Sequence, residues 1–318
     1  MMRIWKYGVC LVASVAFTAG SPASGPITPP SFQRMFEGHC SANEIFILTP
    51  PYSRSQAPSA AFAQPCANAI AFDPSSGTVG VTSGAVYGKL SIRIYRPPYS
   101  SSSVPAATFT PRGLVHPRSA AWDTAGNLWA ADDEANRVFE FRPPFSTTTQ
   151  AAKALTLATQ PSGLAIDPQT RFMFVTDLGG GRACAKTSCR IDVLDAPYTG
   201  KPAATMTFPH AQPFVVAVDE SGRLFAGVDR GRASDATIDV YQPPFASSER
   251  PAFALHPGGP VRALAFDHRG NLFAQLLDSG VVEFVAPISG TRFAPSAILG
   301  CPKGLTCKHG WAGLAFGP

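Results

Sequence analysis

A unit of about 47 residues recurs along this chain, and this repeat constrains the fold more than any other feature. Its first marker is an apolar run that ends in an aspartate, at Asp73, Asp123, Asp167, Asp219 and Asp267. A sixth copy of the run, at 314–317, lacks the acid. The second marker, which we call the proline corner, is an aromatic residue directly after a proline. It occurs at Tyr52, Tyr99, Phe145, Tyr198 and Phe245, and Ile288 takes the sixth place without an aromatic ring. Both markers therefore predict six units.

Each unit has the pattern of four short β-strands. In the third unit we predict strands at 120–123, 127–131, 137–141 and 153–157. Asp123 and Gly126 form the turn between the first two, because aspartate caps its own turn and glycine accepts the left-handed conformation. Pro143 and Pro144 end the third strand, since proline cannot donate to a β-ladder. Four-stranded units at this period predict an all-β fold, a six-bladed β-propeller.

The two ends of the chain predict how the ring closes. The first unit has a strand at 44–49 and a corner at Tyr52, but no aspartate-ended run before them. The chain ends with such a run, at 310–317, and nothing after it. We therefore expect the C-terminal strand to join the N-terminal blade, which leaves no open sheet edge.

The third unit also carries a family resemblance. Residues 119–141, SAAWDTAGNLWAADDEANRVFEF, resemble an NHL repeat. Gly126, Asn127, Leu128 and Trp129 are similar to the D-G-N-L-W motif of streptogramin lyase-type propellers and of the SMP-30/gluconolactonase group. The resemblance covers all six units loosely and two units well, the second at 267–273. It implies the propeller fold, which binders, scaffolds and enzymes share.

The first residues predict an export signal at 1–23, followed by a single propeller domain at 24–318. Arg3 and Lys6 precede a short apolar stretch at 7–17, and small residues follow it. The stretch is too short to cross a bilayer, and the sequence has no second apolar run of membrane length. We expect a secreted or periplasmic protein without a membrane span after cleavage.

Six cysteines remain once Cys10 leaves with the signal. An even number in an exported chain indicates disulfides. We predict that Cys184 pairs with Cys189 and Cys301 with Cys307, because these pairs are close in sequence. Cys40 then pairs with Cys66 by elimination and would tie the first unit to the start of the second blade.

Bulk charge narrows the possible partners. The net charge of +5 is spread along the chain, and no run of five lysines and arginines occurs. Nucleic-acid binding is therefore not expected.

Hydrophobic residues make up 45% and charged residues 15%, which allows a sizeable core. We expect a monomer.

The loops that lead into the inner strands meet at the channel mouth, where a propeller can carry a site. The residues about five before each marker are Asn68, Arg118, Ser162, Phe214, Arg262 and, in the last unit, Trp311 beside Ala312. Two long loops, 178–190 and 229–237, add Arg182, Arg230 and Arg232 to the same face. These positions are our candidate ligand-binding residues.

Arg118 and Arg262 come from units three apart in a ring of six, so we expect them to face each other across the mouth. Guanidinium groups stay charged and present planar forks to carboxylates and phosphates. The sequence thus predicts a non-catalytic protein that binds a partner protein or a small anionic ligand. In the competing interpretation, the two arginines turn outward and pair with Asp123 or Asp267.

A metal-assisted hydrolase or lyase of the SMP-30 or streptogramin lyase type is the alternative function. The resemblance implies metal ligands at the mouth positions, and only Asn68 has a suitable side chain there. Four histidines in loops before inner strands could supply a metal site or an acid and base: His116, His210, His256 and His309. The G-x-S-x-G, H-E-x-x-H and G-x-G-x-x-G motifs are absent from the sequence. We therefore expect no cofactor and no metal.

Overall fold

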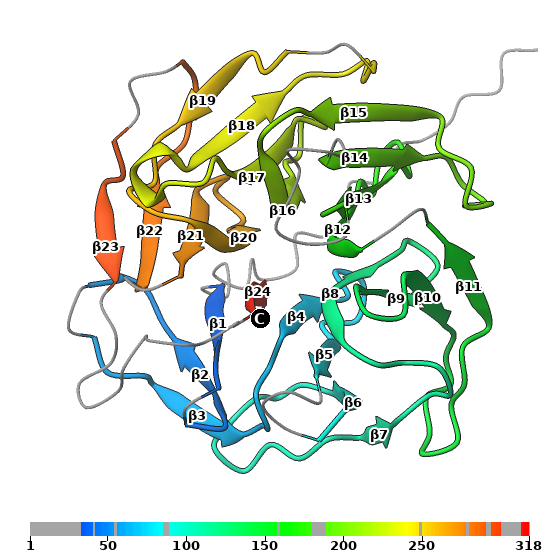
Figure 1. Cartoon of the computed structure of the whole chain (residues 1–318). Helices are drawn as coiled ribbons and strands as arrows, with labels where there is room; N and C mark the ends of the chain where they lie inside the picture. Colours follow the sequence, from blue (N-terminus) through cyan, green and yellow to red (C-terminus); the bar gives the residue numbers. More distant parts are fainter. Residues whose placement is uncertain are drawn as a thin grey trace, which may run out of the picture. The chain divides into compact units, whose positions relative to one another are not determined.

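Six four-stranded sheets surround a central channel in the computed structural model of this chain (Figure 1). The structure describes residues 33–317 except 41, 54–55, 85–88, 158–159, 180–188, 248–249, 278–279, 291–293 and 300–312. All described residues belong to one compact unit, Phe32–Pro318. The predicted all-β, six-bladed propeller is confirmed.

We number the blades so that blade 1 holds the N-terminal strands, and give each blade's strands from the channel outwards. Blade 1 consists of β24 (Leu314–Gly317), β1 (Arg34–His39), β2 (Glu44–Leu48) and β3 (Ala60–Ala63). Blade 2 consists of β4 (Ala69–Phe72), β5 (Val79–Ser83), β6 (Ser91–Tyr95) and β7 (Ala107–Phe109). Blade 3 consists of β8 (Pro117–Trp122), β9 (Leu128–Asp132), β10 (Arg137–Phe141) and β11 (Lys153–Thr156). Blade 4 consists of β12 (Pro161–Ile166), β13 (Met173–Asp177), β14 (Cys189–Leu194) and β15 (Ala204–Phe208). Blade 5 consists of β16 (Gln212–Val218), β17 (Leu224–Asp229), β18 (Thr237–Tyr241) and β19 (Phe253–Leu255). Blade 6 consists of β20 (Val261–Phe266), β21 (Leu272–Leu276), β22 (Gly280–Phe284) and β23 (Ala297–Leu299). One short 3-10 helix, η1 (Ala233–Asp235), precedes β18.

The C-terminal strand closes the ring as predicted. β24 pairs antiparallel with β1, with Phe316 opposite Met35 and Leu314 opposite Glu37. β24 also contacts the inner strands of both neighbouring blades, β4 and β20. Each of the six inner strands therefore contacts an inner strand on either side, and together they form the wall of the channel.

The repeated aspartates cap the turn between the first and second strands of their blades. Oδ1 of Asp123 accepts hydrogen bonds from the backbone N–H groups of Ala125 and Asn127, each at 2.9 Å. The other marker aspartates accept the equivalent bond from the residue two positions on. Gly126 follows with φ of +77°, a conformation that glycine adopts without strain. The turn chemistry expected from the sequence is therefore present.

The second repeated marker fastens neighbouring blades together. Tyr198 of blade 4 packs edge-on against Trp129 of β9 in blade 3, with ring centroids 5.2 Å apart. Phe245 of blade 5 meets Phe174 of β13 in the same way, at 4.9 Å. Tyr52 and Tyr99 likewise contact aromatic rings on the second strand of the preceding blade. The proline corner thus positions a ring between two blades.

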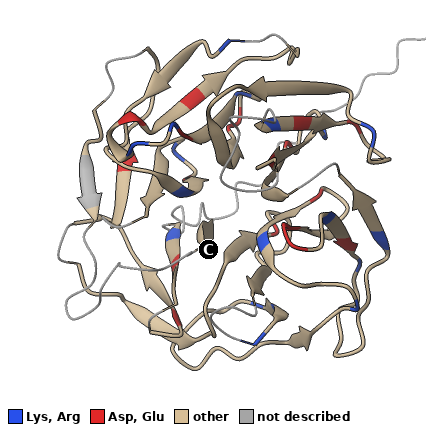
Figure 2. Ribbon diagram, in the orientation of Figure 1, with Lys and Arg blue, Asp and Glu red and all other residues tan. Residues whose placement is uncertain are grey.

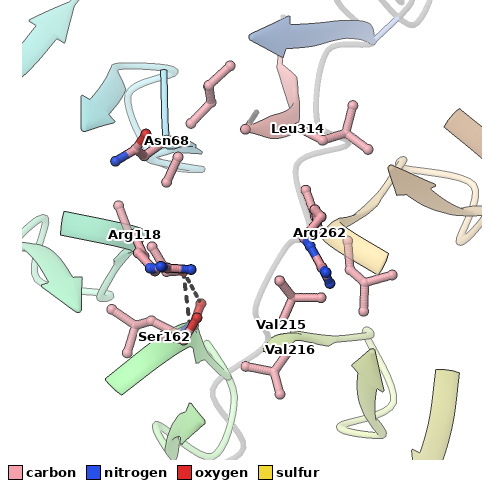
Figure 3. Close-up of a pocket in the computed structure, with 15 residues that line it drawn as sticks. Asn68, Arg118, Ser162, Val215, Val216, Arg262 and Leu314 are labelled. Atoms are coloured by element: carbon pink, nitrogen blue, oxygen red, sulfur yellow. Dashed lines mark hydrogen bonds between the residues drawn. The ribbon is translucent and has the colours of Figure 1, made fainter. Parts of the chain in front are cut away.

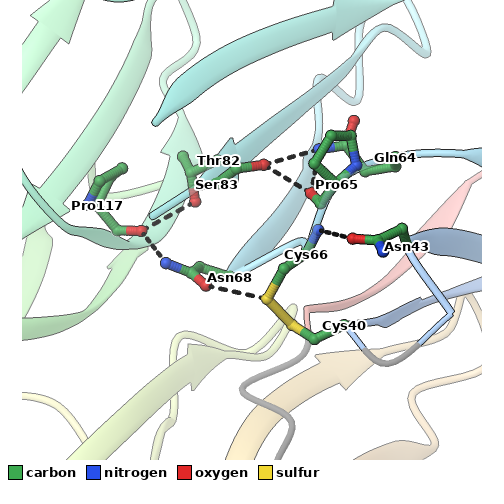
Figure 4. The surroundings of a disulfide bond; sticks show 9 residues. All are labelled: Cys40, Asn43, Gln64, Pro65, Cys66, Asn68, Thr82, Ser83 and Pro117. Carbon is green, nitrogen blue, oxygen red and sulfur yellow. Dashed lines mark hydrogen bonds between the residues drawn. A yellow bond between two sulfur atoms is a disulfide. The ribbon is translucent and has the colours of Figure 1, made fainter. Parts of the chain in front are cut away.

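A disulfide joins Cys40 to Cys66, as predicted (Figure 4). Cys40 follows β1 and Cys66 lies just before β4, so the bond links blade 1 to blade 2 beside the closing strand. Cys189 is also disulfide-bonded. Its predicted partner Cys184 lies outside the described residues, as does the predicted pair of Cys301 with Cys307, and these pairings remain predictions.

Replacing both Cys40 and Cys66 with serine is expected to lower the free energy of unfolding by about 3.5 kcal/mol, from the chain entropy of a loop of this length. The bond joins residues 26 apart, and without it the unfolded chain gains that freedom. Urea denaturation of the oxidised proteins measures the difference. A loss under about 1 kcal/mol would show that this disulfide contributes much less than the loop model gives.

Candidate functional site

Four inner strands carry an irregularity near their mouth ends. The pairing of β8 with β9 shifts register at Arg118, and that of β20 with β21 shifts at Arg262. The equivalent shift falls at Ser162 and Gly163 in blade 4 and at Phe214 in blade 5. A β-bulge adds one residue to a strand and re-aims its side chain. These candidate residues therefore leave the regular ladder where the strands enter the channel.

A cavity of about 90 Å³ lies where the six inner strands meet (Figure 3). Asn68, Arg118, Ser162 and Arg262 line it, from blades 2, 3, 4 and 6. Arg118 and Arg262 stand on opposite sides, and the head of Arg118 points toward Ser162 (Figure 3). The structure thus brings four of the nine candidate ligand-binding residues into one cavity.

Arg118 is held from the outer side of the mouth by a carboxylate. Its Nε forms an ion pair with Oδ2 of Asp133, a buried residue that follows β9. Oδ1 of the same carboxylate lies 2.8 Å from Nδ1 of His116, which is also buried. Asp133 therefore bridges an arginine and a histidine and fixes the direction of the Arg118 side chain.

Arg262 is held by an aromatic ring. Its guanidinium carbon lies 4.2 Å from the ring centroid of Phe214, and Nη1 donates a hydrogen bond to the Val261 carbonyl at 3.1 Å. Such a cation–π contact contributes about 2 kcal/mol when it is desolvated. Oδ2 of Asp229 lies 3.9 Å from Nη2, at the outer limit of an ion pair. Phe214 supports Arg262 instead of lining the cavity.

Asn68 is fixed at the junction of blades 2 and 3. Its Nδ2 donates to the Pro117 carbonyl at 3.1 Å, and its Oδ1 lies 3.9 Å from Sγ of Cys66 (Figure 4). The disulfide therefore lies directly beside a residue of the cavity wall. This packing holds the Asn68 amide at a set place on the rim.

The remaining candidate residues lie elsewhere. Arg230 pairs with Oδ2 of Asp239 at 2.7 Å, Arg232 is exposed, and neither lines the cavity. Arg182 and Trp311 lie outside the described residues. The competing interpretation, in which Arg118 and Arg262 turn outward to Asp123 or Asp267, does not match the contacts above.

Sequence reasoning missed the acids that balance the basic loops. Arg190 lies 3.3 Å from Oδ2 of Asp177 and 3.2 Å from Oδ2 of Asp192. Acidic and basic segments lie next to each other around the channel (Figure 2). A signal was present, because β14 and β18 share an Ile-Asp-Val triplet that places Asp192 and Asp239 between two apolar residues. Arg190 and Arg230 are therefore matched by acids of their own blades.

Burial raises the pKa of Asp192 above its ordinary value of 3.8, and the nearby Asp177 adds to this, while Arg190 and a hydrogen bond from Thr205 oppose it. The folded protein then binds this proton more readily than the unfolded chain, so wild-type stability falls as pH rises above about 4. Asp192→Asn removes that loss. We expect its free energy of unfolding to increase relative to wild type as the pH rises above about 4.

Asp73→Asn is the matched control with the opposite sign. Burial alone raises the pKa of Asp73, but hydrogen bonds from Ser76 and Ser75 outweigh it and hold this pKa below 3.8. Its ionised form therefore stabilises the fold at neutral pH, so Asp73→Asn should have a lower free energy of unfolding than wild type there. This difference from wild type should shrink only below about pH 4. Urea denaturation across pH measures both. A pH-independent difference for Asp192→Asn would contradict the raised pKa.

The predicted histidine rim is not assembled in the described part of the chain. His116 is buried against Asp133, whereas His210 and His256 are exposed. His309 lies outside the described residues. No group of three or more His, Cys, Asp or Glu side chains among the described residues is placed to hold a metal ion. Within the same residues, no helix has the length and apolar character needed to cross a membrane.

Comparisons with known proteins identify the fold. No protein-family model and no curated protein matches this chain. Hydrazine synthase from Kuenenia stuttgartiensis is similar over 73% of this chain and 66% of its own, just under two thirds, with a TM-score of 0.55 and 16% identity. A protein of unknown function from Bacteroides caccae is similar over 90% of this chain and 99% of its own, with a TM-score of 0.59 and 11% identity. Identities this low show the propeller fold alone.

Proposed function

We propose that this chain is an exported, NHL-like β-propeller whose channel mouth binds a small anion or an acidic group of a partner protein, without catalysing a reaction. One observation carries the proposal. Two guanidinium groups from opposite blades line a single cavity enclosed by all six inner strands.

The two arginines suit an anion that lies between them. Both are permanently charged, and each fork offers several N–H donors in one plane. Asp133 engages Arg118 through Nε, and the contact of Arg262 with Asp229 spans 3.9 Å. Only 8% of the Arg262 side chain is exposed, so an anion that reaches it meets little screening by water.

The size of the cavity limits the ligand. Sites for drug-sized molecules usually measure roughly 300 to 1,000 Å³. The cavity here measures about 90 Å³. A small anion, or one acidic side chain of a partner protein, is therefore the occupant that fits.

Two features support the exported location. The segment at 1–23 has the charge and apolar pattern of a signal peptide. The Cys40–Cys66 disulfide is typical of proteins that fold in an oxidising compartment. The alternative of a metal-assisted hydrolase or lyase has no comparable support among the described residues.

An NMR titration with acetate tests the proposal. Arg118→Gln and Arg262→Gln should each weaken binding about tenfold or more, since each removes a charged hydrogen bond worth about 1.5–3 kcal/mol. Arg232→Gln is the control, because this exposed residue lies outside the cavity. Melting curves verify that the variants fold. Equal acetate affinity in all four proteins would overturn the proposed function.

A further inference from the structure

The wall of the cavity changes character along the inner strands. Four of its polar residues, Asn68, Arg118, Ser162 and Arg262, stand near the mouth ends of their strands. The fifth, Ser119, accepts a hydrogen bond from the backbone N–H of Leu164 at 3.0 Å, so its hydroxyl is already engaged with the wall. A position two residues further along an inner strand lies deeper in the channel, by at most about 6–7 Å at a rise of about 3.3 Å per residue. At that depth the cavity is lined by Ile70, Ala120, Leu164, Val216, Leu264 and Leu314.

This deeper ring is aliphatic in all six blades. None of its six side chains carries a hydrogen-bonding group, and Ile70, Leu164, Val216 and Leu314 are buried. The cavity therefore has two zones: a charged rim at the mouth and an apolar shaft below it. A ligand that fills both zones needs a charged head and an apolar stem.

An inorganic oxyanion matches only the first zone. Phosphate or sulfate is polar on every side, so the face turned to the shaft would lose water without gaining a hydrogen bond. A carboxylate on an aliphatic stem presents its two oxygens to the arginine forks and its carbons to the shaft. Each methylene that it buries there should tighten binding about fourfold.

We propose that the site selects a carboxylate on a short aliphatic stem over inorganic oxyanions. This inference rests on the proposed function and names its ligand class. A cavity of about 90 Å³ restricts the stem to a few carbons. The same chemistry occurs in a free short-chain acid and in a glutamate side chain presented by a partner protein.

The test compares acetate, propanoate, butanoate and inorganic phosphate at one ionic strength. We expect the dissociation constant to fall about fourfold with each added methylene, and phosphate to bind more weakly than butanoate. A capped Gly-Glu-Gly peptide is the additional arm. Binding of the peptide near that of propanoate identifies a partner side chain as the source, and its exclusion identifies a free acid.

Ala120→Leu should fill the shaft, so the dissociation constant should no longer fall from acetate to propanoate to butanoate. Ala233→Leu, an exposed substitution in η1, is the matched control and should keep the gradient. Should Ala120→Leu fail to fold, Leu264→Asn serves instead, because a polar shaft should flatten the gradient.

The outcomes separate the two proposals. Phosphate that binds as tightly as butanoate, with no dependence on stem length, overturns the ligand class and leaves the anion site standing. Failure of every anion to bind the folded wild-type protein overturns both.

Discussion

Deletion of residues 314–318 is expected to abolish cooperative folding. These residues include the whole of β24, the inner strand of blade 1. Leu314, Ala315 and Phe316 are all buried, and the Phe316 ring lies 4.7 Å from that of Phe273 in blade 6. Without β24, the edge of β1 and one sixth of the channel wall would be exposed to water.

Thermal unfolding followed by circular dichroism checks this expectation. The truncated protein should aggregate or melt over a broad range, because the ring is open and its apolar wall is unpaired. Deletion of Pro318 alone is the control, since it leaves the residues of β24 in place. A truncated protein that melts as sharply as wild type, at the same temperature, contradicts the closure.

Trp129→Ala is expected to cost about 3–5 kcal/mol of the free energy of unfolding, as for other large aromatic residues in cores. Trp129 is 2% exposed and packs against Tyr198 of the next blade. Its Nε1 also donates to Oδ2 of Asp123 at 2.9 Å. It therefore joins both repeated markers, the capped turn and the proline corner.

Trp129→Phe is the matched variant for this position. It keeps an aromatic ring against Tyr198 but loses the hydrogen bond to the Asp123 carboxylate, so its loss should be about 1.5–3 kcal/mol. We expect guanidinium denaturation to give the highest free energy of unfolding for wild type, a lower one for Trp129→Phe and the lowest for Trp129→Ala. Equal stability of the Phe and Ala variants would contradict the role given to the ring contact.

The fold was predictable because its constraints are local and repeated. Asp123 and Gly126 specify a turn through their own backbone and side-chain chemistry, and similar turns recur along the chain at the spacing of the repeat. The closure followed from one missing strand and one spare strand. The role of the proline corner was not predictable, because the contact of Tyr198 with Trp129 crosses two blades and only the folded ring brings them together.

The site was predictable only in part. Arg118 and Arg262 occupy equivalent positions in the repeat, and units three apart in a ring of six lie on opposite sides of the channel. Their meeting at one cavity could therefore be predicted. Their partners depend on bulges and loop conformation that spacing does not specify. Phe214 therefore lies under Arg262 instead of facing the cavity, and Asp133 pairs with Arg118 although no motif marks it.

Arg118 and Arg262 bind one anion together in the proposed function, and a double-mutant cycle on acetate binding tests this most directly. Dissociation constants are measured for wild type, Arg118→Gln, Arg262→Gln and the double variant. We predict one acetate per protein and non-additive losses, with a coupling above about 0.5 kcal/mol, because both side chains contact the same ligand. Losses that add within that margin, or two independent acetate sites of which each substitution removes one, would contradict the account.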